Sequence, residues 1–303
     1  MIIGIALNPE SGAGRAEKYR TQLLKVVNEY PVDVVWLDAE SASEAVNNMQ
    51  ASVNSGEIDA LVVVGGDGMI HLGVEAVGDS GIPLGIVAAG SGNDIAREFK
   101  LPIHNLEDSL HQVIASLFAR RFYEVDAIEI ESEEGIKRAM AIVSLGLDAD
   151  VNERTNRMKW PKGNMRYIRA IGQSIRNYSP YGVKIHANGH SGSGSMTLLC
   201  LANTRYAGGG FALAPEAKPN DGLLDVVITR GLSLKEFGSL LPKLTLGKHT
   251  LDPRVHRFRT REITVEPDVS QGDFPPAVMA DGEYICTLPA TIRVKQKAIK
   301  LAL

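Results

Sequence analysis

The first part of the chain alternates short apolar runs with longer helix-like segments. The apolar runs are Ile2–Leu7, Val32–Leu37, Leu61–Val64 and Leu84–Val87. Runs that are apolar throughout are typical of strands buried on both faces of a sheet. Strands that alternate with helices form βαβ units, and these place their strands parallel to one another. We therefore predict an α/β domain with a parallel sheet over residues 1–121.

From about Phe122 the pattern changes, and apolar runs follow one another with little between them. The predicted strands are Tyr123–Glu131, Ile136–Leu145, Val183–Ala187, Met196–Ala202, Leu224–Thr229 and Phe258–Glu266. Only two helices are expected among them, around residues 164–177 and 233–244. Consecutive strands of this kind predict a mostly antiparallel sheet. The second domain is therefore expected to be β-rich and to cover residues 122–289.

Two of the predicted parallel strands end in glycine-rich loops. The loops read Gly65-Gly66-Asp67-Gly68 and Gly90-Ser91-Gly92-Asn93-Asp94. Glycines leave backbone N–H groups unshielded, so a phosphate can approach closely. Asp67 adds a carboxylate where a phosphate-bound Mg²⁺ would sit, and a helix that begins near Asn93 would favour an anion at its N-terminus. The pair of loops predicts a nucleotide-binding cleft.

The two glycine-rich loops do not match the common nucleotide-binding motifs. Neither is followed by Gly-Lys-Ser or Gly-Lys-Thr, so a Walker A phosphate loop is excluded. The first loop does not fit Gly-x-Gly-x-x-Gly either, which argues against a dinucleotide-binding Rossmann domain. Either loop alone would also fit a tight turn between a strand and a helix, without a ligand.

The composition of the chain limits which binding partners and which cellular compartment are expected. With 303 residues, of which 44% are hydrophobic, the chain can fill a core in each of two domains. Its net charge of −4 gives no general attraction to nucleic acid, so no nucleic-acid partner is expected. The only cysteines, Cys200 and Cys286, lie in apolar segments and are predicted to be buried thiols. No apolar run approaches the ~20 residues that span a bilayer, and Met1–Leu7 is too short for a signal peptide. A cytoplasmic protein is therefore expected.

Further motifs follow in a fixed order along the chain. They are Asn8-Pro9-Glu10-Ser11-Gly12-Ala13-Gly14 after the first strand, Asn203-Thr204-Arg205-Tyr206-Ala207-Gly208-Gly209-Gly210, Asn220-Asp221-Gly222, and Asp281-Gly282-Glu283 near the end. As an ordered set with the two loops, they resemble the diacylglycerol kinase catalytic family, which includes sphingosine kinases and the bacterial YegS-like lipid kinases. The resemblance covers nearly the whole chain. NAD kinases share the first Gly-Gly-Asp-Gly, and Met69 stands where the family usually has threonine.

The resemblance implies a fold, a reaction and a set of site residues. Residues 290–303 would return to the first domain, and the active site would lie in the cleft between the domains. ATP would donate its γ-phosphate, with Mg²⁺, to a hydroxyl of a membrane lipid such as diacylglycerol. Asp67 would be catalytic, and either Asp281 or Glu283 would accept the proton of the lipid hydroxyl. The implied nucleotide-binding residues are Asn8, Pro9, Ser11, Gly12, Gly65, Gly66, Gly68, Met69, His71, Gly90, Ser91, Asn93 and Asp94.

Two of these motifs are also turns by their local pattern alone. Asp281-Gly282 fits the type I′ turn of a β-hairpin, which would be a rigid mount for two carboxylates. Asn220-Asp221-Gly222 is likewise a turn by default. The resemblance implies that the second turn holds a structural Mg²⁺ through the Asp221 carboxylate and the backbone carbonyls of Lys218 and Leu223, and hard oxygen ligands suit this ion.

The segment from Arg154 to Arg176 is the most strongly charged part of the chain. It has no acidic residue and seven basic ones: Arg154, Arg157, Lys159, Lys162, Arg166, Arg169 and Arg176. Apolar residues recur in it at helical spacing, which predicts an amphipathic helix. The helix either packs on the β domain with a solvated basic face or docks on an anionic membrane surface. The second alternative predicts a cytoplasmic enzyme that associates peripherally with a membrane.

Three functions are compatible with these features. The leading hypothesis is an ATP- and Mg²⁺-dependent lipid kinase. A NAD kinase is the first alternative, although the second loop and the segment from Tyr206 to Gly210 match the lipid kinases better. The third is a lipid- or nucleotide-binding relative without activity, which Met69 motivates and the intact Asp67, Asp281 and Glu283 oppose. The lipid and the oligomeric state stay open, with a homodimer as one alternative.

Overall fold

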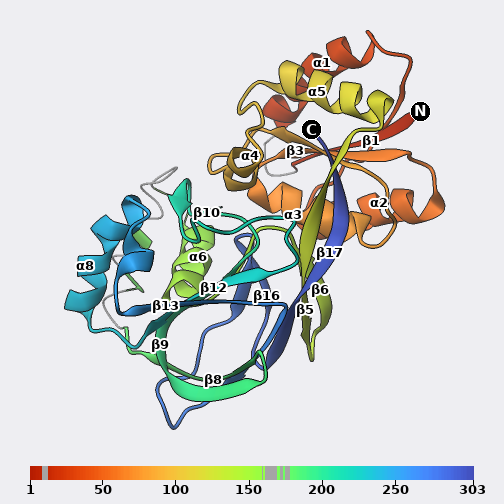
Figure 1. Cartoon of the computed structure of the whole chain (residues 1–303). Helices are drawn as coiled ribbons and strands as arrows, with labels where there is room; N and C mark the ends of the chain where they lie inside the picture. Colours follow the sequence, from red (N-terminus) through yellow and green to blue (C-terminus); the bar gives the residue numbers. More distant parts are fainter. Residues whose placement is uncertain (9–12, 159, 161–168, 171–172, 175–177) are drawn as a thin grey trace. The chain divides into compact units, whose positions relative to one another are not determined.

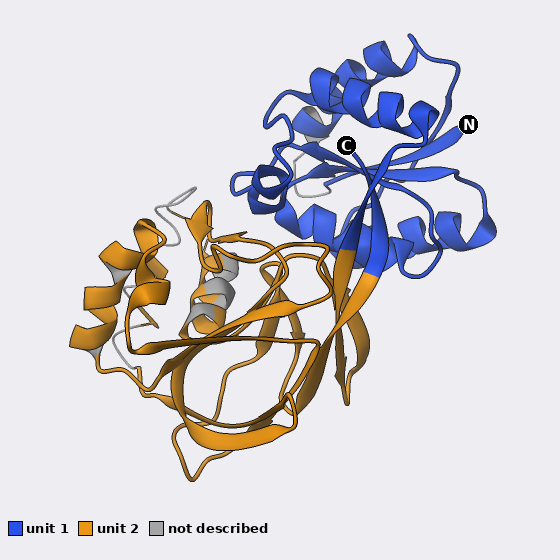
Figure 2. Cartoon of the chain, viewed as in Figure 1, with its two compact units in different colours: residues 1–125, 297–303 blue, residues 126–296 orange. Residues whose placement is uncertain are grey.

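The computed structural model describes residues 1–8, 13–158, 160, 169–170, 173–174 and 178–303 (Figure 1). The chain divides into two compact units (Figure 2). Unit 1 comprises residues 1–125 and 297–303, and unit 2 comprises residues 126–296. The divisions fall a few residues later than the predicted limits at 121 and 290.

Unit 1 contains the parallel sheet that the apolar runs predict. Its strands are β1 (Ile2–Leu7), β2 (Asp33–Trp36), β3 (Ala60–Gly65) and β4 (Leu84–Ala88). They lie in the order β4-β3-β1-β2, and every neighbouring pair is parallel. The end of β17 (Ala290–Ala302) lies beside β4, where Leu301 is opposite Leu84. The fold class expected for the first part of the chain is confirmed.

Helices cover both faces of this sheet (Figure 1). They are α1 (Ala13–Val27), α2 (Ala42–Ser55), α3 (Asp67–Val77), α4 (Asp94–Glu98) and α5 (Leu106–Ala119). On one face, Ile3 and Ile5 of β1 join Leu110 and Ile114 of α5 in a buried core. Helices α2 and α3 pack together on the other face. Cover on both sides explains why β1, β3 and β4 are apolar throughout.

Unit 2 is built mostly from antiparallel strands. They are β5 (Phe122–Ser132), β6 (Gly135–Ala139), β7 (Ile142–Gly146), β8 (Tyr181–Ala187), β9 (His190–Ala202), β10 (Tyr206–Ala207), β11 (Phe211–Ala212), β12 (Leu224–Arg230), β13 (Val255–Thr260), β14 (Glu262–Pro267), β15 (Val278–Ala280) and β16 (Glu283–Cys286). The order β16-β15-β7-β9-β8-β14 runs through this sheet, and β12 joins β9 to β13. The predicted antiparallel β domain is confirmed.

The structure differs from the prediction at several elements of unit 2. The strand predicted over 136–145 is two strands, β6 and β7, and the strand predicted over 258–266 is likewise β13 and β14. Helix α8 (Leu234–Thr245) lies where a helix was predicted, and η3 (His249–Leu251) follows it. Helix α6 (Leu147–Arg157) was not predicted. The helix predicted around 164–177 lies largely outside the described residues.

Two simpler expectations can also be compared with the structure. Cys200 and Cys286 are both buried and free of disulfides, as predicted. Within the described part of the chain, no helix is long and apolar enough to cross a membrane.

Candidate functional site

The two glycine-rich loops of unit 1 touch each other through their backbones. A Cβ added at Gly66 would lie 3.1 Å from Gly90 Cα, and one added at Gly90 would lie 2.9 Å from Gly66 N. The Ala89 N–H donates to the Gly65 carbonyl at 2.8 Å and ties the two loops together. A side chain at Gly90 would overlap the Gly66 backbone and one at Gly66 would be crowded, so the close approach favours glycine at both positions. The loops therefore form one continuous surface at the ends of β3 and β4.

Asn93 fixes the shape of the second loop. Its backbone is left-handed, with φ of 55°, a conformation that asparagine tolerates better than most residues. Its side-chain oxygen accepts the Gly90 N–H at 3.0 Å, and its side-chain nitrogen donates to the Gly90 carbonyl at 2.7 Å. Because Asn93 is only 1% exposed, it shapes the loop from within.

Asp67 joins the first loop to the short helix α4. It is the first residue of α3, and its two carboxylate oxygens accept the N–H groups of Asp94 at 3.1 Å and Ile95 at 3.0 Å. The local sequence pattern predicts a carboxylate beside phosphate and Mg²⁺ and does not predict the bonds to α4. A carboxylate oxygen can accept more than one bond, so a part in binding a phosphate-bound ion stays a prediction.

Replacing Asp67 by alanine is expected to weaken the loop pair as well as any nucleotide contact. The change removes two charge-assisted hydrogen bonds and leaves two N–H groups without this acceptor, which should cost about 2 kcal/mol in unfolding free energy. Asp67→Asn keeps one acceptor oxygen and should lie between alanine and the wild type. Urea unfolding and ATP titration of the three proteins would measure both effects. Wild-type stability of Asp67→Ala would contradict the bracing role.

Several predicted nucleotide-binding residues lie inside unit 1. Met69 is 4% exposed and packs beneath the first loop, since a Cβ at Gly65 would meet Met69 Cβ at 2.7 Å. His71 is 3% exposed, and its Nε2 lies 3.7 Å from Glu75 Oε2 one turn along α3. The side chain at position 69 therefore lies on the interior side of the loop, and the hydroxyl of the family's usual threonine would be absent from that side.

The remaining described members of the predicted set lie in the second loop or at the ends of elements next to the loops. Gly68 lies in the first turn of α3, Ser91 is exposed, and Asp94 pairs with Arg97 at 2.5 Å. The Asn8 N–H donates to the Val64 carbonyl at 3.1 Å, which brings the end of β1 beside the end of β3. Pro9, Ser11 and Gly12 lie outside the described residues.

In unit 2, Asp281 binds a short segment between β6 and β7. It occupies the hairpin turn between β15 and β16, where φ is 51° at Asp281 and 91° at Gly282, as a type I′ turn requires. The Asp281 carboxylate accepts the N–H groups of Met140 at 2.9 Å, Ala141 at 2.9 Å and Ile142 at 3.0 Å. These three N–H groups turn toward the carboxylate, and this explains why the predicted strand breaks at 140–141.

Asn203 holds the same segment from the side of β9. Its fully buried side-chain nitrogen donates to the carbonyls of Asp126 and Met140, both at 2.8 Å. The backbone N–H groups of Asn203 and Thr204 both donate to the Ala141 carbonyl, at 2.8 and 3.2 Å. The start of the Asn203 motif and the Asp281 turn therefore converge on residues 140–142. The sequence alone predicts no role for Asn203, because nothing local marks residues 140–142 as its partner.

The two carboxylates that the sequence left as alternatives have different surroundings in the structure. Three backbone N–H donors occupy the two carboxylate oxygens of Asp281. Glu283, at the start of β16, is exposed. Asp281 therefore holds the turn in place, and which of the two carboxylates accepts the proton stays a prediction.

The predicted Mg²⁺ loop already has a cationic neighbour. Asp221 Oδ1 accepts the Leu223 N–H at 3.1 Å, while Asp221 Oδ2 lies 3.7 Å from the Arg259 guanidinium. Arg259 also binds Asp225 at 3.0 Å, and burial raises the pKa of Asp225. Among the described residues, no group of three or more His, Cys, Asp or Glu could hold a metal ion. The oxygen ligands suit Mg²⁺, but Arg259 already balances them, so the ion stays a prediction without a step assigned to it.

Comparison with known proteins decides the family. Residues 3–130 match the model of the diacylglycerol kinase catalytic domain. Residues 141–303 match the YegS C-terminal NAD kinase beta sandwich-like domain. The chain belongs to the diacylglycerol kinase and YegS-like lipid kinase family. The glycine loops fall in the first of these matched domains, and the Asp281 turn falls in the second.

Individual relatives of this lipid kinase family agree with that assignment. A diacylglycerol kinase of Mycobacterium tuberculosis is 33% identical over 97% of this chain and 92% of its own length. A probable YegS-like lipid kinase of Xanthomonas oryzae is 31% identical over 87% of this chain and 85% of its own. The crystal structure of a putative diacylglycerol kinase from Bacillus anthracis covers 99% of this chain and 96% of its own, with a TM-score of 0.77 and 19% identity, so the fold is shared.

Proposed function

We propose that this protein is an ATP- and Mg²⁺-dependent kinase that phosphorylates a hydroxyl of a membrane lipid such as diacylglycerol. The observation that carries the proposal is the pair of glycine loops held in backbone contact at Gly66 and Gly90, in a chain of the lipid kinase family. The Gly90 N–H is taken by Asn93 Oδ1, so other N–H groups of the loops would contact the phosphate oxygens. The N-terminus of α3 adds a favourable field for an anion.

In the proposed reaction the protein forms no covalent bond to the substrates, and it acts by positioning them and stabilising charge. The lipid oxygen forms a bond to the γ-phosphorus while the bond from that phosphorus to ADP breaks, and the hydroxyl proton leaves late. Mg²⁺ bound with ATP would neutralise charge on the β- and γ-phosphates. Within this chain, Glu283 accepts the proton, and Asp281 keeps the hairpin that carries Glu283 in one position.

Glu283→Gln is expected to lower turnover about 100-fold without a change in thermal stability. Glutamine keeps the size of the side chain but cannot accept the proton, and general bases typically contribute factors of this order. The Asp281 bonds to residues 140–142 stay intact in this variant. Initial rates with labelled ATP and a short-chain diacylglycerol would measure the loss. An unchanged rate would remove Glu283 from the role of proton acceptor.

One incubation distinguishes the three functional alternatives. Purified protein is given labelled ATP, Mg²⁺ and a total lipid extract, with NAD offered in a parallel reaction. The lipid kinase predicts label in lipid. Label in NAD alone would establish the NAD kinase alternative, and label in neither would favour an inactive relative. The burial of Met69 argues against the inactive relative. Because this side chain points into unit 1, the change from threonine to methionine removes no hydroxyl from the outer surface of the loop.

We further propose that the enzyme is cytoplasmic and meets its substrate at a membrane surface through Arg154–Arg176, without a nucleic-acid partner. Most of that segment lies outside the described residues. Among those described, Arg154 pairs with Asp150 at 2.9 Å, and the Arg169 guanidinium lies 5.5 Å from the ring centroid of Trp160. Trp160 is 72% exposed. An exposed tryptophan beside an arginine suits the interface between water and lipid headgroups.

A further inference from the structure

Two leucines near the end of α8 are strongly exposed. Leu246 follows the helix and is 70% exposed, and Leu251 ends η3 and is 76% exposed. They belong to one hydrogen-bonded turn, since the Lys248 N–H donates to the Lys243 carbonyl at 2.8 Å and the Leu251 N–H to the Lys248 carbonyl at 3.2 Å. Single exposed leucines are common on protein surfaces, but two on one compact turn need an explanation. We call residues 244–251 the α8–η3 turn.

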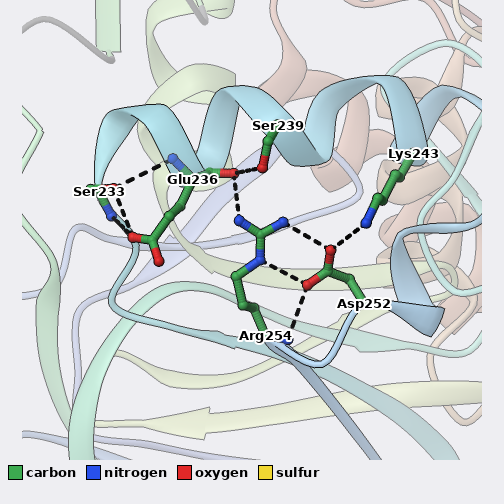
Figure 3. Close-up of polar contacts among 6 residues, drawn as sticks. All are labelled: Ser233, Glu236, Ser239, Lys243, Asp252 and Arg254. Atoms are coloured by element: carbon green, nitrogen blue, oxygen red, sulfur yellow. Dashed lines mark hydrogen bonds and ion pairs between the residues drawn. The ribbon is translucent and has the colours of Figure 1, made fainter.

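A polar cluster fixes the base of the α8–η3 turn (Figure 3). Asp252, directly after Leu251, accepts hydrogen bonds from Lys243 Nζ at 2.6 Å and from Arg254 Nε and Nη2, both at 2.8 Å. These bonds hold the pKa of Asp252 well below its usual range. Arg254 also donates to the Glu236 carbonyl of α8 at 3.2 Å. The chain is therefore bound to α8 just beyond the exposed leucines.

The beginning of α8 is fixed as well. Ser233 and Glu236 form a capping box, in which the Ser233 N–H donates to Glu236 Oε2 at 2.8 Å (Figure 3). The helix is thus capped at its start and bridged to Asp252 near its end. The two leucines stand on an ordered support, and an apolar group that is already ordered loses little entropy when it is buried by a partner.

The segment that carries the turn has an excess of basic residues, in contrast to the net charge of −4 of the whole chain. Residues 234–254 contain four basic side chains, Lys235, Lys243, Lys248 and Arg254, against the two acidic ones Glu236 and Asp252. Lys243 and Arg254 are engaged by Asp252, whereas Lys235 and Lys248 have no ion pair with any described residue. Burial lowers the pKa of His249, so this residue adds no charge near neutral pH. Lys248 therefore provides a positive charge between the two exposed leucines in the sequence.

We propose that the α8–η3 turn docks on an anionic lipid bilayer, with Leu246 and Leu251 in the outer acyl region and Lys248 at the headgroups. This docking proposal depends on the proposed function in one respect: a lipid substrate would bring the enzyme to a membrane. Apolar side chains that flank a lysine match an anionic bilayer in both hydrophobicity and charge. A symmetric contact with a second copy would bring Lys248 against like charge, which disfavours that occupant. This surface is separate in sequence from Arg154–Arg176.

Vesicle sedimentation without nucleotide tests the surface itself. The wild type and the double variant Leu246→Ser, Leu251→Ser are mixed with phosphatidylcholine vesicles, with and without phosphatidylglycerol. We expect the partition coefficient of the double variant to fall about tenfold or more. Lys248→Glu should weaken binding only to the anionic vesicles and mainly at low salt. Val269→Ser changes an apolar residue that is 71% exposed elsewhere in unit 2, and it should bind like the wild type.

The remaining measurements separate this proposal from its competitors. Unchanged partition of the double variant, or no binding by the wild type, would overturn the proposal. So would light scattering that shows a wild-type dimer and a monomeric double variant, because the leucines would then belong to a contact between copies. Activity on a short-chain, soluble diacylglycerol should be the same in the wild type and the double variant. If the wild type lacks that activity but binds vesicles through the leucines, the proposed kinase function fails and the docking surface stands.

Discussion

Asp281→Ala is expected to lower the unfolding free energy by about 3 kcal/mol or more and to abolish turnover. The N–H groups of Met140, Ala141 and Ile142 all lose their acceptor at once, and an unsatisfied buried group costs about 1–3 kcal/mol. Alanine must also hold the left-handed φ of 51°, which adds about 1 kcal/mol. Urea unfolding and a kinase assay would measure the two losses.

Two neighbouring variants make this result specific. Asp281→Asn keeps an acceptor oxygen and tolerates the left-handed turn, so it should recover part of the stability. Glu283→Gln changes a carboxylate two residues away and should leave stability unchanged. If Asp281→Ala unfolds like the wild type, the bonds to residues 140–142 do not hold this part of unit 2 together.

Gly90→Ala is expected to weaken ATP binding at least about 100-fold. The new methyl group would meet Gly66 N and Asn93 Oδ1, each at 2.9 Å, and would overlap Gly66 Cα. Backbone atoms cannot move aside as a flexible side chain can, so the loops must separate. The bond from Ala89 to Gly65 would then break, and the N–H groups that we propose to contact phosphate would lose their common alignment. Titration of the purified variant with ATP would measure the loss.

Gly192→Ala provides the matched control. Gly192 lies in β9, and a Cβ there would meet nothing within 4 Å. The same chemical change should therefore leave ATP affinity and stability close to wild type. Near-normal ATP binding by Gly90→Ala would mean that the two loops can bind nucleotide without their close contact.

Much of the fold could be predicted from the sequence because buried strands require apolar residues, and runs of these are visible in the sequence. Strands β1, β3 and β4 are covered on both faces and are therefore apolar along their whole length. The break between β6 and β7, in contrast, is not visible in the pattern of apolar residues. Met140 and Ala141 are apolar, like Ala139 and Ile142 on either side of them. The carboxylate that turns their N–H groups aside lies 141 and 140 residues along the chain.

In the candidate site, too, some features could be predicted from the local sequence and others could not. The positions of the two glycine loops follow from their local pattern, because only close backbone approach or a special φ requires so many glycines. The roles of single side chains depend on which partner the fold brings to them. Asp67 meets α4, 27 and 28 residues away, and Asn203 meets the carbonyl of Asp126, 77 residues away. No local pattern in the sequence contains those pairings.

The position of β17 has a consequence for how this protein is made. Leu301 and Ala302 pair with Leu84 and Gly85, so the sheet of unit 1 gains the strand beside β4 only when residue 302 has left the ribosome. About 200 residues are synthesised between β4 and that strand. At usual elongation rates this takes on the order of 10 to 40 s. During that time β4 presents an apolar, unpaired edge, which is the kind of edge that recruits chaperones or pairs wrongly with neighbouring nascent chains.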